Sequence, residues 1–222
     1  MRTRAIIIKK QPVKEHDQLI SCYTEEFGKL TAMAKGSLKK ESIQAMHVDL
    51  FNLVDFDLVS GRATPIIAGA QLENGHGFIK SNLNALAAAY FFLEAIDKIV
   101  FDNEKDPLLW RFIENVFRLL DKKVKEGEND FSEFIHEKQA ELLKIMGYAP
   151  NLSECCLCLS PTSGNHRAYS QDLGGALCSD CFLSGQKGIF IKMNDSSVSE
   201  IIFQGIAEKK FDSLNLIKAV TI

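Results

Sequence analysis

Two Cys-x-x-Cys pairs form the strongest candidate for a functional site in this sequence. Cys155 and Cys158 form the first pair, and Cys178 and Cys181 form the second after nineteen intervening residues. A tight turn directs both sulfurs of such a pair to one side, and two pairs together match the tetrahedral coordination of Zn²⁺. Because four thiolates leave no position for water, the spacing predicts a structural zinc site whose binding energy stabilises the surrounding segment.

Other interpretations of these cysteines stay open at this point. Cys156 lies between two predicted ligands; we interpret it as a bystander, although it could exchange with Cys155. His166 lies between the pairs and is an alternative ligand. Buried or redox-active thiols without a metal are a further alternative. A catalytic deaminase-type zinc site would need an H-x-E element, and the sequence contains none.

The first forty residues are basic, although the whole chain has a formal net charge of −3. They contain nine Lys/Arg and four Asp/Glu, a balance of +5, whereas residues 81–150 contain nine and thirteen, a balance of −4. Such asymmetry indicates a site for a polyanion at one end of the chain. The nine basic residues are Arg2, Arg4, Lys9, Lys10, Lys14, Lys29, Lys35, Lys39 and Lys40.

Two aromatic residues accompany these charges. Proteins that bind single-stranded nucleic acid combine a basic groove with aromatic rings on which bases stack. Tyr23 and Phe27 are the aromatic residues of the basic segment. Packing inside the domain is the stronger interpretation for Phe27, whereas for Tyr23 base stacking and packing are equally open.

Hydrophobic patterning predicts the elements that would position these residues. Five short β-branched or alternating runs bounded by turn residues predict a small barrel over roughly the first 75 residues. The predicted strands cover residues 4–10, 19–24, 30–34, 48–60 and 64–72. Residues 35–41 are polar and contain Gly36, which predicts a loop.

The chain changes character at Asn82, from which helical periodicity predicts a helical domain. Ser81-Asn82 and Asp106-Pro107 are helix-start signals, because Asn and Asp side chains accept backbone N–H groups and Pro suits the first turn. A third helix is predicted from Asp130 to Gly147, and one or two more within residues 195–222. These apolar stripes indicate core packing.

Composition excludes several classes of protein. With 46% hydrophobic and 25% charged residues, the 222-residue chain is typical of a globular protein. The apolar runs at residues 5–8 and 85–93 are too short for a signal peptide or a membrane span. We therefore expect a cytosolic protein, in which six cysteines are better explained by metal binding than by disulfides.

Two motif sets in this order resemble the RecO family of recombination mediators. The first set is Glu15-His-Asp-Gln-Leu-Ile20, Tyr23-Thr24, Phe27-Gly-Lys-Leu-Thr31 and Ala34-Lys-Gly36. The second is Gly147-Tyr-Ala-Pro150, Leu152, the first cysteine pair, Tyr169-Ser170, Gly174-Gly175 and the second cysteine pair. The resemblance extends over nearly the whole chain.

The resemblance implies an α+β protein with an amino-terminal OB-fold β-barrel and an all-α domain that carries an inserted four-cysteine zinc finger. The expected boundaries are 1–79 for the OB-fold and 80–222 for the helical domain, with the finger at about 148–185. Its implied zinc ligands are Cys155, Cys158, Cys178 and Cys181. Lys35 of the Ala-Lys-Gly element is the foremost DNA contact, and the other expected contacts are Lys39, Lys40, Lys9, Lys10, Lys29, Arg2, Arg4 and Tyr23.

The implied function is non-enzymatic DNA repair and homologous recombination at the bacterial nucleoid. The family resemblance implies binding of single- and double-stranded DNA, annealing of complementary strands, and partnership with RecR and the tail of the single-stranded DNA-binding protein, so that RecA loads at gaps. The alternatives are a zinc-stabilised scaffold without DNA binding, which the net charge favours, and a thiol oxidoreductase or zinc hydrolase. The last 28 residues contain only three basic residues, Lys209, Lys210 and Lys218, so DNA contacts are not expected there.

Overall fold

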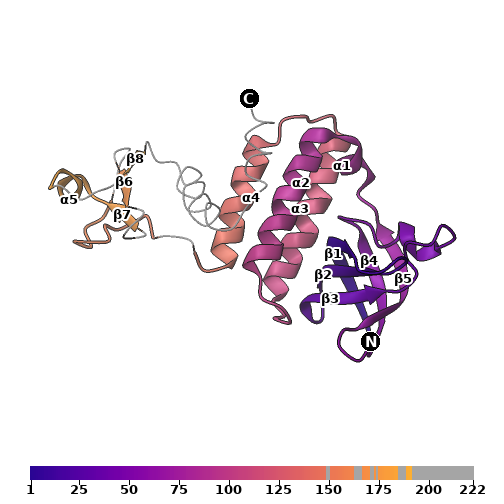
Figure 1. Cartoon of the computed structure of the whole chain (residues 1–222). Coiled ribbons are helices and arrows are strands. Elements are labelled where there is room, and N and C mark those ends of the chain that lie inside the picture. The colour runs from indigo at the N-terminus through magenta and orange to yellow at the C-terminus, as the bar shows by residue number, and fades with distance from the viewer. Residues whose placement is uncertain (149–150, 163–166, 171–172, 174, 185–188, 192–222) are drawn as a thin grey trace. The chain divides into compact units, whose positions relative to one another are not determined.

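A computed structural model describes residues 1–148, 151–162, 167–170, 173, 175–184 and 189–191 (Figure 1). The chain forms two compact units, one spanning Met1–Phe131 and the other beginning at Ser132. The helices predicted within residues 195–222 lie outside the described residues.

Five strands form a closed barrel at the amino terminus, which confirms the predicted OB-like fold. Around the barrel the strands follow the order β1-β2-β3-β5-β4. The contact between β3 and β5 is parallel, and the other pairings are antiparallel. The strands are β1 (Arg2–Pro12), β2 (Gln18–Thr24), β3 (Gly28–Ala34), β4 (Leu53–Val59) and β5 (Ile66–Asn74).

The barrel interior is filled by the apolar positions that alternate along each strand. In β3, Leu30, Ala32 and Ala34 are buried, and the residues between them are less so. Ile7, Ile20 and Phe56 face them in the same core cluster. Cys22 lies in this core, where burial raises the pKa of its thiol to about 12. Its thiol is therefore protonated at neutral pH.

The fourth strand is shorter than the sequence predicts. The expected run began at residue 48, but β4 begins at Leu53. The backbone turns just before it: Phe51 has a left-handed φ of 66°, and the Asn52 N–H donates to the Asp49 carbonyl at 3.2 Å. A short 3₁₀ helix, η1 (Ile43–Met46), precedes this turn.

Three helices follow the barrel within the same unit: α1 (Gly77–Ser81), α2 (Leu83–Ile99) and α3 (Pro107–Lys125). The two predicted helix starts are confirmed. The Asn82 side chain accepts from the Ala85 N–H at 3.0 Å, and Asp106 accepts from the N–H groups of Leu108 and Leu109. Helix α2 contacts both β1 and α3, so these helices pack on the barrel.

The second unit contains α4 (Ser132–Ile145), which matches the predicted third helix, and the cysteine segment. That segment has three short strands and one helical turn. They are β6 (Arg167–Ser170), β7 (Gly175–Leu177), α5 (Ser179–Leu183) and β8 (Ile189–Ile191), with the strand order β7-β6-β8. Among the described residues, no helix has the length and apolarity needed to cross a membrane.

Candidate nucleic-acid interface and metal centre

Four lysines lie in the loops of the barrel, and we call them the loop lysines: Lys14, Lys35, Lys39 and Lys40. All four are exposed. Lys14 is in the connection between β1 and β2, and the other three follow β3. None of the four makes an ion pair with any residue that the structure describes. Their charges are therefore directed to solvent.

Hydrogen bonds between the two loops shape this region. The Gly36 N–H donates to Oδ1 of Asp17 at 2.8 Å, and the Leu38 N–H donates to the His16 carbonyl at 3.1 Å. Gly36 has a left-handed φ of 65°, which glycine adopts without strain. Between the loops lies an open pocket of about 470 Å³, lined by Lys14, Glu15, His16, Asp17, Lys35, Gly36 and Lys39.

The other five basic residues of the first forty lie on strands, and we call them the strand cations: Arg2, Arg4, Lys9, Lys10 and Lys29. Each is paired with a carboxylate. Arg2 lies 2.6 Å from Asp55, and Lys9 lies 3.5 Å from Asp97. Because the side chains of Arg2 and Lys9 are 68% and 58% exposed, DNA contact by these two stays a prediction.

Lys10 shares its carboxylate with a second lysine. Its Nζ lies 2.6 Å from Oδ1 of Asp49, and Lys80 Nζ lies 3.1 Å from Oδ2. Burial by itself raises the pKa of Asp49, but hydrogen bonds from the two ammonium groups outweigh burial and lower it. DNA contact by Lys10 stays a prediction, although half-buried pairing competes with it.

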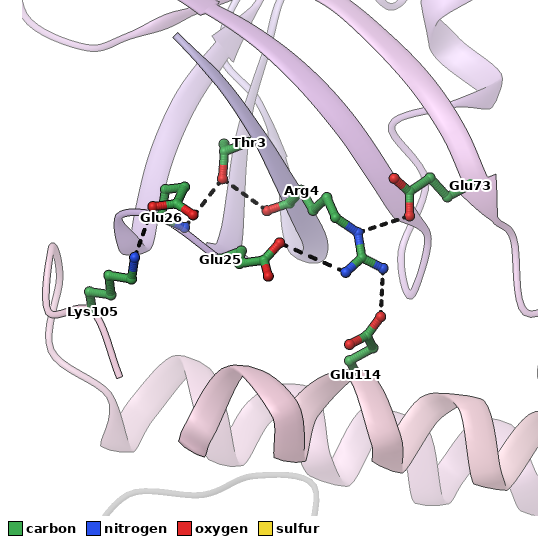
Figure 2. Close-up of polar contacts among 7 residues, drawn as sticks. All are labelled: Thr3, Arg4, Glu25, Glu26, Glu73, Lys105 and Glu114. Atoms are coloured by element: carbon green, nitrogen blue, oxygen red, sulfur yellow. Dashed lines mark hydrogen bonds and ion pairs between the residues drawn. The ribbon is translucent and has the colours of Figure 1, made fainter. Parts of the chain in front are cut away.

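Arg4 joins the barrel to α3, as Figure 2 shows. Its guanidinium donates to Glu114 at 2.6 Å and to Glu73 at 3.0 Å, and lies 3.8 Å from Glu25. It also lies over the ring of Trp110, 5.6 Å from the centroid. Three carboxylates surround one cation here and compete with the DNA contact expected of Arg4, which stays a prediction.

Lys29 and Tyr23 hold the segment between α2 and α3 against the barrel. Lys29 Nζ donates to the Asp97 carbonyl, lies 3.1 Å from the Asp97 carboxylate, and has a side chain only 12% exposed. The Tyr23 ring is 0% exposed and stacks on Trp110 with centroids 6.5 Å apart. Its ring therefore has no face free for a base, which corrects the expectation for Tyr23, and Lys29 likewise leaves the expected DNA contacts.

Phe27 lies where the stronger interpretation placed it. Its half-buried side chain packs against the barrel core. Gly28, which follows it, has a left-handed φ of 68°, and a Cβ there would meet the Glu104 carbonyl oxygen at 2.1 Å. The Phe-Gly-Lys element of the sequence therefore fits the barrel to the helices.

The four predicted zinc ligands come together. The sulfurs of Cys155, Cys158, Cys178 and Cys181 all lie within 4.8 Å of one another, and those of Cys158 and Cys178 are 3.6 Å apart. A tetrahedral ion with Zn–S bonds of about 2.3 Å needs sulfurs roughly 3.8 Å apart. The four cysteines therefore fit the ion that their chemistry selects.

Local turns direct these sulfurs to one point. The Leu159 N–H donates to the Cys155 carbonyl at 2.9 Å, and Leu159 has a left-handed φ of 59°. In the second pair, Cys178 caps α5 and its sulfur accepts from the Cys181 N–H at 3.4 Å. Burial raises the pKa of the Cys155 thiol, but backbone N–H groups of Cys158, Cys178 and Leu157 outweigh this and lower it to about 6. Such donors favour the thiolate that binds a metal.

Cys156 lies apart from the cluster, as the bystander interpretation predicts. Its sulfur is not among the four clustered sulfurs, and its Cβ lies 2.8 Å from the position that a Cβ would take on Gly175. Gly175 thus allows β7 to approach the first turn, and the Cys156 N–H donates to the Ala176 carbonyl at 2.8 Å. His166, the alternative ligand, lies outside the described residues.

Two family models match the chain in consecutive stretches. Recombination protein O N terminal matches residues 1–75, and Recombination protein O C terminal matches residues 80–220.

The chain belongs to the RecO family.

Several proteins of the RecO family align with this chain over most of their length. "DNA repair protein RecO" of Cutibacterium acnes is 30% identical over 184 residues, which are 81% of this chain and 73% of the relative. The protein of the same name from Clostridium kluyveri is 31% identical over 180 residues, 81% of this chain and 68% of the relative. That of Dehalococcoides mccartyi is 29% identical over 203 residues, 90% of this chain and 77% of the relative.

The predicted DNA contacts did not include three residues that line the pocket with Lys35 and Lys39. They are Lys14, His16 and Asp17. A signal was available, because the Lys14–Asp17 run is a polar turn between two strands and carries charge at every position except that of the histidine. What the sequence does not contain is the distance between this turn and the loop after β3.

Proposed function

We propose that this RecO-family chain binds single- and double-stranded DNA through the loop lysines and mediates DNA repair by homologous recombination. The observation that carries the proposal is the division of the nine basic residues: the strand cations are paired with carboxylates, whereas the loop lysines make no ion pair with any described residue. Unpaired ammonium groups in loops of a barrel are suited to phosphates, because they lose no internal partner on binding.

Annealing of complementary strands follows from this chemistry. Lysines that neutralise phosphates on two strands reduce their mutual repulsion, and contacts to phosphates leave bases free to find partners. With four loop lysines, the log–log dependence of single-strand affinity on salt has a slope of roughly −3. No covalent step is part of this function.

The wider role rests on family membership. We propose that the chain works in the bacterial cytoplasm at the nucleoid, with RecR and the tail of the single-stranded DNA-binding protein as partners. It would help load RecA onto gaps that this DNA-binding protein coats. The acidic balance of residues 81–150 suits contacts with protein partners better than with DNA.

We further propose that Cys155, Cys158, Cys178 and Cys181 hold one structural Zn²⁺. When bound, the ion would crosslink the two cysteine turns, whose small apolar cluster contains Ala168, Leu177 and Phe182. Metal analysis of the purified protein is expected to find about one zinc per chain. Cys158→Ser is expected to lose it, and Cys156→Ser, the matched control, is expected to keep it. Equal loss in both variants would contradict the assignment of the ligands.

The central test is fluorescence anisotropy of a labelled single-stranded oligonucleotide at two salt concentrations. Lys35→Glu is expected to weaken binding about tenfold, since a reversed charge replaces an attraction with a repulsion. Lys122→Glu is the control, because it makes the same change of charge at an exposed lysine near the end of α3. Equal effects of the two variants, or binding that ignores salt, would refute the proposed interface.

The second candidate function is a zinc-stabilised scaffold that binds proteins and no DNA. The net charge of −3 and the pairing of the five strand cations favour it. It predicts that the wild-type chain leaves the oligonucleotide unbound at low salt. The same titration therefore separates the two functions.

A further inference from the structure

We propose that the pocket between residues 13–17 and 35–39 is a binding pocket for a phosphate group of nucleic acid, in which Lys14 and His16 act together with Lys35 and Lys39. Asp17 is its positioning residue. The inference deepens the proposed function and rests on it for the kind of ligand. It adds a second loop to the interface and a role for an acidic residue.

Two hydrogen bonds join the two loops, and others close each loop on itself. The Val13 N–H donates to the Asp17 carbonyl at 3.1 Å and closes the first loop. Asp17 Oδ1 and the His16 carbonyl then accept from Gly36 and Leu38 of the second loop. Within the second loop, Ser37 Oγ donates to the Ala34 carbonyl at 3.1 Å. The pocket is thus formed before any ligand arrives.

The charge around the pocket favours an anion. Lys14, Lys35 and Lys39 line it without an ion pair to any described residue, so three cations share one open volume. Two carboxylates also line it. Asp17 uses Oδ1 to accept a backbone N–H, and the Glu15 side chain is 88% exposed, 3.9 Å from Nε2 of His16. Neither carboxylate pairs with a pocket lysine, because that of Asp17 accepts a backbone N–H and that of Glu15 extends into water. The lysines can therefore act on an anion that enters the pocket.

The lining also indicates which anion. Its seven residues are three lysines, two acids, a histidine and a glycine, so it offers no apolar side chain. An acidic peptide with an apolar end would find charge here but no apolar side chain to pack against that end. A phosphate on a flexible strand needs only cations and donors, and ammonium groups act on it as point charges. About 470 Å³ of open volume admits such a group with its adjoining sugar.

The proposed role of Asp17 predicts that removal of this acidic side chain weakens the binding of an anion. If only the sum of charges mattered, removal of any acid near the pocket would tighten binding of an anion. We expect Asp17→Ala to weaken it, because the Gly36 N–H loses its acceptor and the lysine loop leaves its position. Asp17→Asn retains an amide oxygen as acceptor and removes the charge, so it is expected to bind at least as tightly as wild type. Glu15→Gln, a change at the exposed acid, is expected to tighten binding slightly.

The experiment titrates the full-length protein into a labelled single-stranded oligonucleotide, with inorganic pyrophosphate as competitor. Thermal denaturation confirms that each variant is folded. We expect Lys14→Glu to weaken binding about tenfold, Asp17→Ala about threefold, and Lys122→Glu not at all. We also expect pyrophosphate to displace the oligonucleotide more effectively than an acidic peptide of equal charge.

Each contrary result identifies what fails. Wild-type affinity in Lys14→Glu, with binding lost in Lys35→Glu, would overturn the pocket and leave the proposed function intact. Tighter binding by Asp17→Ala would overturn the positioning role, and stronger competition by the peptide would overturn the ligand class. If the wild type binds no DNA, the proposed function fails. Pyrophosphate then tests the pocket alone through amide shifts at Lys14 and Lys39, and their absence would overturn it.

Discussion

The strand cations and the loop lysines of the barrel come from one basic segment but lie in opposite surroundings. On the strands, each cation has an acidic partner on another strand, a helix or a loop, as Arg4 has in Glu73 and Glu114 and Lys10 has in Asp49. In the loops, no described acidic residue pairs with Lys35 or Lys39, and hydrogen bonds of the backbone and of the Asp17 side chain set the path of the chain. The same residue types thus hold the fold together in one place and are exposed to ligands in the other.

The net charge of a segment does not by itself show which of its cations can bind a polyanion. The balance of +5 in the first forty residues predicts a polyanion site, but five of the nine cations already have carboxylate partners. An internal pair adds little to the field at the surface, whereas an unpaired lysine contributes fully. The local balance of the loops therefore matters more than the balance of the segment.

The largest expected effect concerns the hairpin that presents Lys29 to its carboxylates. In Gly28→Ala, a left-handed φ of 68° and a Cβ at 2.1 Å from the Glu104 oxygen would force the hairpin away from α2 and α3. We expect a loss of about 3 kcal/mol or more in the free energy of unfolding, measured by urea denaturation.

Gly127→Ala is the matched control for this prediction. Gly127 has a left-handed φ of 91°, and nothing lies within 4 Å of a Cβ there. It isolates the backbone strain, roughly 1–2 kcal/mol, from the collision. Equal losses in the two variants would show that the barrel does not depend on this contact with the helices.

The next effect concerns Arg4. Arg4→Met keeps much of the contact with Trp110 but leaves the three carboxylates without their cation. We expect a loss of about 2 kcal/mol of stability and unchanged DNA affinity in the folded protein, measured by denaturation and anisotropy. Arg2→Met, at an exposed pair, is the control and should lower the stability much less than Arg4→Met does. A loss of DNA affinity with little change in stability would place Arg4 among the DNA contacts after all.

The loop lysines should show the reverse pattern. Replacing Lys35 and Lys39 together by Ala removes two phosphate contacts, so the salt slope on single strands should become shallower by about 1.4. The free energy of unfolding should stay within about 0.5 kcal/mol of wild type, because neither side chain makes an internal ion pair among the described residues. A clear loss of stability would mean that the loops are as structural as the strands.

The smallest expected effect is a dependence of stability on pH at the barrel–helix connection. His76 is 2% exposed, and its Nδ1 lies 2.7 Å from the Phe51 carbonyl oxygen. Burial lowers the pKa of the imidazole, while the Phe51 carbonyl and the charge of Asp121 oppose this shift and that of Lys80 adds to it. The folded protein therefore binds this proton more weakly than the unfolded chain. Its contribution is fully present above the unfolded pKa of about 6.5 and is lost as the pH falls below it.

His76→Asn tests this sign. Asn accepts the left-handed φ of 46° found at His76 and does not titrate. Between about pH 7.5 and about pH 5.5, the urea midpoint of wild type should fall more than that of the variant. Parallel curves would show that this histidine does not contribute to the pH dependence of stability.

Several features could be predicted because short stretches of chain determine them. Asn82 and Asp106 begin helices by accepting N–H groups two or three residues away, and two cysteines separated by two residues share one turn. Alternating burial in β3 likewise follows from the period of a strand. The late start of β4 was not predicted, because Phe51 adopts a left-handed turn while its ring packs on Tyr90 and Phe117, distant in sequence.

The barrel, the helix starts, the clustering of the four cysteines and the family could be predicted from the sequence, because each depends on residue types at short or fixed separation. Which cations have a carboxylate partner among the described residues became clear from the tertiary structure alone. Ion pairs such as Arg4–Glu114 and Lys29–Asp97 join residues far apart in the chain, and so does the stacking of Tyr23 on Trp110. The pocket that joins Lys14 to Lys35 depends on the pairing of β2 with β3, which places Gln18 beside Ala34 and so brings the two loops together. Such distances arise from folding, and no local pattern encodes them.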